Sequence, residues 1–223
     1  MRSFSIQKKR SAPRSRFHNP QSSRRSVSLR LEPLEDRLML STITWDGGGN
    51  DFNWNNPLNW NTDALPGAGD DVTIDYGDNS FTVSHAANAT DAVKSVNSQA
   101  AVRISGGTLD IAETSMLAGA LNLTGGGVLT GTGDITVNGP MTWYDSLLYG
   151  TGTLTVNGPL NFGNDALSRT LISNDSINWD GRGIDMHSGS SIVNRGVFDI
   201  GVDGTVLFNL GGGPFLNEGQ LVK

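Results

Sequence analysis

The sequence predicts an all-β protein built as a parallel β-helix, a solenoid in which short coils of about 19–23 residues stack on one another. Three observations support this prediction. Near-identical segments recur at a fixed offset, and each segment alternates apolar and polar residues with the period of a β-strand. Glycine or proline interrupts every window that could form a helix, and 29 of the 223 residues are glycine.

The repeat is clearest between residues 131–143 and 150–162, which share eight of 13 positions at an offset of 19. Residues 172–177 match 192–197 at an offset of 20, and residues 193–197 match 216–220 at an offset of 23. At about 21 residues per coil, the repeat region 80–223 would hold about seven coils. A Greek-key sandwich also uses short strands and glycine-rich turns, but it does not predict near copies at a fixed offset.

Within each unit, apolar residues should face the interior and the polar residues between them should face solvent. In the two best copies, the inward set is Ile135, Val137, Leu154 and Val156. Asn138 and Asn157 hold equivalent places after these strands, so stacking should join them in a side-chain ladder.

Residues 42–79 form a different segment, rich in Trp, Asn and Gly. Its three tryptophans are Trp45, Trp54 and Trp60. The order Trp-Asp-Gly, Trp, Asn-Trp, Pro-Gly-x-x-Asp and then a strand resembles the module that opens many bacterial autotransporter-like and adhesin-like passenger regions. The resemblance implies the start of a parallel β-helix.

A solenoid needs such a module because its first coil would otherwise expose an apolar interior and unpaired edge amides. The large tryptophan rings suit this capping role, and glycan contact through their faces is the alternative. The nearby Asp46, Asn50 and Asp51 leave a calcium site open, although Asp and Asn are also the usual residues of turns.

Residues 1–41 are expected to be a disordered basic leader, since residues 1–31 carry nine Lys or Arg and no acid. The remaining chain has seven basic and 22 acidic residues, a net charge of −15. The end of the leader resembles the LEPR-XLL type of N-terminal motif that heads many large planctomycete surface proteins, with residues 34–36 inserted between its halves. The matching residues are Leu31, Glu32, Pro33, Arg37, Leu38 and Leu40. The resemblance implies export to the cell envelope or exterior, and a short amphipathic turn is the alternative interpretation.

The sequence offers little chemistry. It has no cysteine, no run of 18 apolar residues, no paired histidines and no glycine-rich phosphate loop, so we expect neither a metal nor a cofactor. The enzyme alternative is a β-helix polysaccharide hydrolase or lyase that gathers carboxylates from adjacent coils on one face. Its candidate residues are Asp180, Asp185, Asp199 and Asp203.

The expected function is therefore that of a structural or adhesin-like protein, displayed at the cell surface or secreted, with no catalytic activity of its own. Its expected partners are cell-envelope or matrix components, with glycans among the candidates. The acidic body would repel nucleic acid. Residues 214–221 read as the opening of another coil, so we expect the chain to be part of a longer polypeptide.

Overall fold

The computed structural model describes residues 42–223, except residues 87, 164, 182, 202 and 204–205. The residues of the expected export motif lie outside the described residues; they are Leu31, Glu32, Pro33, Arg37, Leu38 and Leu40. In the described part of the chain, no helix is long and apolar enough to cross a bilayer.

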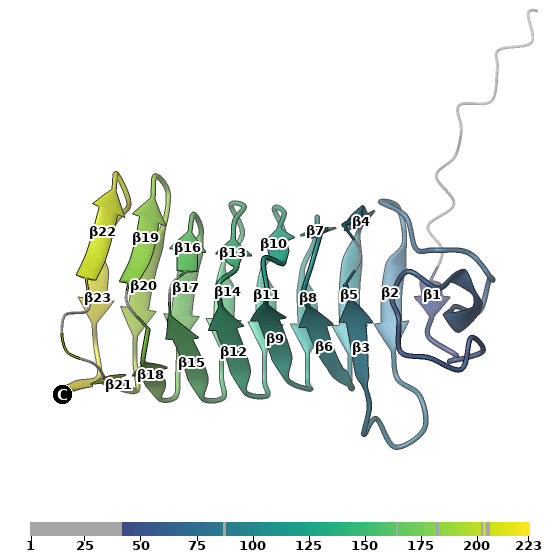
Figure 1. Ribbon diagram of the computed structural model, residues 1–223, viewed down its shortest axis with the longest axis horizontal. Coiled ribbons are helices and arrows are strands. Elements are labelled where there is room, and N and C mark those ends of the chain that lie inside the picture. The colour runs from purple at the N-terminus through teal and green to yellow at the C-terminus, as the bar shows by residue number, and fades with distance from the viewer. Residues whose placement is uncertain (1–41, 87, 164, 182, 202, 204–205) are drawn as a thin grey trace, which may run out of the picture. The chain divides into compact units, whose positions relative to one another are not determined.

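The described chain is a parallel β-solenoid of three sheets, as predicted (Figure 1). The nine-stranded sheet contains β1 (Thr42–Thr44), β2 (Asp71–Ile74), β5 (Ser95–Ser98), β8 (Ser115–Leu117), β11 (Ile135–Val137), β14 (Leu154–Val156), β17 (Thr170–Ser173), β20 (Ser191–Asn194) and β23 (Phe215–Asn217). The eight-stranded sheet contains β3 (Thr82–His85), β6 (Ala101–Ile104), β9 (Leu121–Thr124), β12 (Met141–Tyr144), β15 (Leu160–Gly163), β18 (Ile177–Trp179), β21 (Val197–Ile200) and β24 (Gln220–Val222). The seven-stranded sheet contains β4 (Thr90–Val93), β7 (Thr108–Ile111), β10 (Val128–Thr130), β13 (Leu147–Leu148), β16 (Asp165–Leu167), β19 (Gly183–His187) and β22 (Val206–Leu210).

Each coil visits the three sheets in turn, so that every strand pairs in parallel with the equivalent strand of the next coil. Val137 pairs with Val156, nineteen residues later, so the two near-identical copies lie directly on one another. This register confirms the solenoid of about seven turns and excludes the Greek-key sandwich, whose strands pair antiparallel. From β2 onward, the offsets run from 17 residues between Leu154 and Leu171 to 24 between Val72 and Val96.

One predicted offset is wrong by a single residue. The structure pairs Ile172 with Val193 and Ser173 with Asn194, an offset of 21 instead of 20. The isoleucines of the two segments suggest the shorter offset, but Ile172 faces outward and its neighbour Leu171 is the buried residue. A slip of one residue exchanges the two faces of a strand, so burial fixes the longer offset. The offset of 23 between Val193 and Leu216 is confirmed.

The coils share one apolar interior that runs from Ile43 to Phe198. The four residues predicted to face inward, Ile135, Val137, Leu154 and Val156, are all at most 1% exposed. The predicted asparagine ladder is also present. Asn157 Nδ2 donates to Asn138 Oδ1 at 2.8 Å, and Asn174 extends the ladder by one coil with a bond of 2.7 Å to Asn157.

The tryptophan-rich segment folds over the first coil, at the dark-blue end of the solenoid in Figure 1. It leaves β1 at Trp45, passes through the short 3-10 helix η1 (Pro57–Asn59) and returns to β2. On the way, its backbone pairs with β3: Ser84 N donates to Phe52 O at 2.7 Å, and Trp54 N donates to Ser84 O at 2.9 Å. The segment therefore supplies hydrogen bonds to the first edge of the eight-stranded sheet, which is what a cap must do.

Candidate functional site

The three tryptophans belong to the core. Trp45, Trp54 and Trp60 are at most 1% exposed, and Trp60 packs edge-on against both of the others at ring distances of 5.1 and 4.9 Å. The Trp60 indole N–H donates to Trp54 O at 2.9 Å. Because the protein covers these rings, they offer no face on which a sugar could stack, and the sequence-based suggestion of glycan contact through them is corrected.

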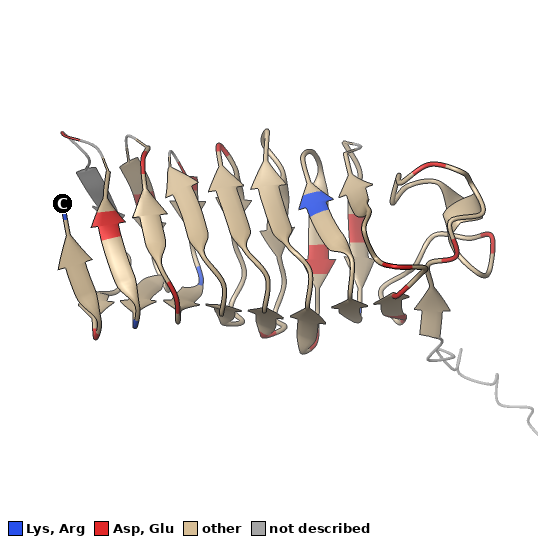
Figure 2. Cartoon of the chain, turned by 90° about the horizontal axis from the view of Figure 1, so that it is seen from below, with Lys and Arg blue, Asp and Glu red and all other residues tan. Residues whose placement is uncertain are grey.

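The four candidate catalytic aspartates are divided between two sheets and the turns beside them. Asp185 lies in β19 of the seven-stranded sheet, whereas Asp199 lies in β21 of the eight-stranded sheet. Asp180 accepts a hydrogen bond of 2.7 Å from the Tyr144 hydroxyl, and Asp203 forms an ion pair of 2.9 Å with Lys223. Figure 2 shows acidic residues dispersed along the solenoid on the face in view. Asp180 and Asp199 come from adjacent coils, since Trp179 pairs with Ile200, whereas Asp185 belongs to another sheet.

Asp165, which the sequence did not single out, is the most perturbed carboxyl group among the described residues. It is 5% exposed and accepts the Ser146 N–H at 3.2 Å and the Gly163 N–H at 2.8 Å. Burial outweighs these bonds and raises the pKa of Asp165 to about 8. Since the group barely reaches solvent, it holds the turn after β12 rather than meeting a ligand, and no sequence pattern distinguishes it from an ordinary turn aspartate.

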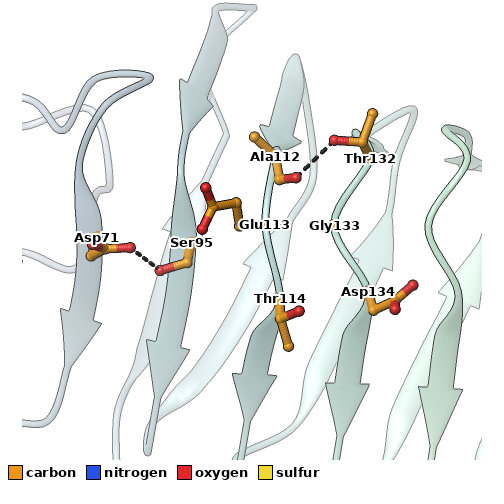
Figure 3. Close-up of a pocket in the computed structure, with 8 residues that line it drawn as sticks. All are labelled: Asp71, Ser95, Ala112, Glu113, Thr114, Thr132, Gly133 and Asp134. Atoms are coloured by element: carbon orange, nitrogen blue, oxygen red, sulfur yellow. Dashed lines mark hydrogen bonds between the residues drawn. The ribbon is translucent and has the colours of Figure 1, made fainter. Parts of the chain in front are cut away.

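A shallow acidic groove of about 380 Å³ crosses the nine-stranded sheet near β5 and β8 (Figure 3). Its carboxylates already have partners. Asp71 accepts hydrogen bonds from Lys94 at 2.8 Å and Ser95 at 2.6 Å, which lower the pKa of Asp71, and Asp134 accepts the Thr153 N–H at 2.7 Å. No group of three acidic or histidine side chains in the described ranges could hold a metal ion. The groove is therefore a set of contacts between coils.

A second recess of about 380 Å³ lies on the outer face of the eight-stranded sheet. It is lined by Thr82, Ser84, Arg103, Asn122 and Thr124. These are the outward residues of three successive strands, and the recess is polar and open.

The cap carries the most apolar of the three recesses, a cleft of about 440 Å³. Its lining is Trp45, Gly47, Asn50, Asp51, Phe52, Tyr76, Gly77, Asp78, Ser80 and Phe81. The cleft forms where the loop before η1 faces the turn between β2 and β3. We call it the cap cleft.

Aromatic rings form one wall of the cap cleft. Phe81 stacks on Phe52 at a ring distance of 5.5 Å and an angle of 16°, and on Trp45 at 6.2 Å and 22°. Tyr76 meets Phe81 edge-on at 6.3 Å. Phe52 and Tyr76 are 56% and 51% exposed, so this wall presents ring surface to solvent while Trp45 anchors it in the core.

Two carboxylates lie beside these rings. Hydrogen bonds from Asn53 N–H, and then from the Asn59 and Asn56 side chains, lower the pKa of Asp51. Hydrogen bonds from the hydroxyl and N–H of Ser80 lower the pKa of Asp78. Both groups are therefore ionised at neutral pH, and the lining contains no Lys or Arg. The Asp51 oxygens accept from N–H donors, which gives this residue a role in the loop that needs no calcium.

Sequence reasoning missed this cleft because its rings come from positions 52, 76 and 81. The available signal was local: Phe52 and Tyr76 are apolar residues placed inside polar turns, next to Asp51 and Asp75. Such a residue must either pack inward or remain exposed, and here both remain largely exposed.

Comparison with known proteins adds no relative. No family model, curated protein or solved structure matches the chain significantly.

Proposed function

We propose that this chain is an exported structural or adhesin-like β-helix protein, displayed at the cell surface or secreted, with no catalytic activity of its own. The observation that carries the proposal is the stacked solenoid, in which many outward strand positions are Thr, Ser or Asn and in which Asp71 and Asp180 accept hydrogen bonds within the fold. Such a rod suits display of a surface at one end. The basic leader and its LEPR-XLL-like residues support export.

Localisation of the full chain tests the export part of this proposal. A C-terminal epitope tag would be followed in a planctomycete host, the group whose motif the leader resembles. We expect external protease to remove the tag from intact cells, or the tag to appear in the medium. A matched variant with Leu38→Ala and Leu40→Ala should retain the tag inside. Equal retention of both proteins in the cytoplasm would refute export.

The catalytic alternative has its own test. The purified chain would be incubated with a panel of polysaccharides, and the release of reducing ends would be measured against an Asp180→Ala/Asp199→Ala variant. We expect no release by either protein. Release that disappears in the variant would overturn the non-catalytic assignment.

A further inference from the structure

We propose that the cap cleft is a carbohydrate-binding site for an uncharged, hydroxyl-rich sugar, with Phe52 and Tyr76 as its stacking surfaces and Asp78 as a hydrogen-bond acceptor. The inference deepens the proposed adhesin-like function and rests on it. The proposed stacking surfaces are not the three buried tryptophans but Phe52 and Tyr76, which solvent can reach.

Shape is the first argument. The ring planes of Phe52 and Phe81 are inclined by 16°, and those of Phe81 and Trp45 by 22°. The three rings therefore form a layered wall with Phe52 at its open side. The C–H face of a pyranose ring matches an exposed aromatic face of this kind, and amphipathic binding sites combine such faces with a few placed polar groups.

Rigidity is the second argument. The backbone of Phe52 is fixed by its bond with Ser84 in β3. Tyr76 is held by a tight turn in which its N–H donates to Asn79 Oδ1 at 2.9 Å, while Asn79 N–H returns a bond of 3.1 Å to Tyr76 O. Both rings therefore project from ordered backbone, and a preorganised site loses less conformational entropy when it binds.

Charge selects the ligand class. Asp51 and Asp78 are ionised, and no basic side chain lines the cleft, so an anionic polysaccharide would be repelled. Sugar hydroxyls can donate to carboxylate oxygens, and hydrogen bonds to charged acceptors are stronger than neutral ones. An organic cation would also meet favourable charge, but the near-parallel rings form a wall instead of a surrounding cage.

The test uses the full chain and soluble neutral oligosaccharides of glucose, mannose, galactose and N-acetylglucosamine. Trp45 lines the cleft, so intrinsic tryptophan fluorescence and calorimetry both report occupancy. Phe52→Ala and Tyr76→Ala should each weaken binding by about tenfold or more, as truncation of an aromatic anchor does. Leu58→Ala is the matched control, because Leu58 is 54% exposed on the same cap but does not line the cleft.

Binding of a neutral oligosaccharide that is lost in both ring variants and kept in the control would support the site. The proposal fails if no neutral oligosaccharide binds, if the ring variants bind normally, or if tetramethylammonium or an anionic polysaccharide binds instead. Unchanged far-UV circular dichroism and melting temperature of the variants exclude misfolding. Export is measured separately, so a wild-type chain that is displayed normally but binds no neutral oligosaccharide refutes the site and leaves the proposed export intact.

Discussion

Val156→Asp tests the stacking of the coils at a single residue. Val156 is fully buried in β14, where it lies between Val137 of the preceding coil and Ser173 of the next. Its neighbour Thr155 points the other way, between Thr136 and Ile172. The same change at these adjacent positions therefore separates the effect of the interior from the effect of placing an aspartate in this strand.

The expected cost at Val156 is large. Losing the burial of a valine side chain costs about 1.5–3 kcal/mol. An unpaired carboxylate in an apolar interior costs several kcal/mol more, because the hydroxyl of Ser173, the paired residue in the next coil, already donates to Asp175 O at 3.2 Å. The sum, about 5–8 kcal/mol, is comparable with the whole stability of a typical domain, about 5–15 kcal/mol.

Thermal unfolding followed by far-UV circular dichroism measures the difference. Val156→Asp should lower the melting temperature by at least about 10 °C or abolish the cooperative transition. Thr155→Asp should cost less than about 1 kcal/mol, since it exchanges one solvent-facing polar residue for another. Equal effects of the two substitutions, or an unchanged transition in Val156→Asp, would refute the assigned register.

Three further substitutions probe the turns. Gly152→Ala should destabilise the protein by about 2–4 kcal/mol in urea unfolding, because a Cβ there would overlap the Gly133 carbonyl of the coil below. Asn157→Ala removes both ladder bonds and should cost about 1–2 kcal/mol by the same measurement. Asp165→Asn should alter the pH dependence. The pKa of Asp165 rises from 3.8 to about 8 on folding, so its protonated form stabilises the fold below pH 4, and this contribution is lost as the pH rises to 8. The side chain introduced in Asp165→Asn does not titrate, so the variant does not lose this stabilisation. The urea midpoint of the variant minus that of the wild type should therefore rise between pH 4 and pH 8.

A control or a contradicting outcome accompanies each of these substitutions. Gly67, like Gly152, lacks a positive φ, and a Cβ added to it would meet only the Asp70 carboxylate at 3.6 Å, so Gly67→Ala is the control without the backbone overlap. A ladder variant as stable as the wild type would mean that water replaces the amide bonds. Parallel pH profiles for Asp165→Asn and the wild type would show that Asp165 is ionised in the folded protein.

The sequence predicted the parts of the fold in which one coil copies another. Val137 and Val156 could be aligned because the flanking Asn-Gly-Pro is repeated in both. The predicted alignment was wrong by one residue at Ile172, because apolar residues occupy both faces of this strand. The sequence does not show whether Leu171 or Ile172 is the buried residue. Burial depends on the coil above and below, and no local pattern encodes it when the alternation is lost.

The candidate site escaped prediction for a related reason: the chain builds its aromatic cleft where it departs from the repeat. Coils near the middle return after 17–20 residues, which leaves turns too short to project beyond the sheets. Between β1 and β2 the return takes 29 residues, as the pairing of Thr42 with Asp71 shows. Those additional residues both cap the core with buried tryptophans and carry Phe52 to the rim of the cleft. Long loops on a rigid scaffold are where binding surfaces usually arise, so in this solenoid sealing the first coil and forming the cleft are two consequences of the same insertion.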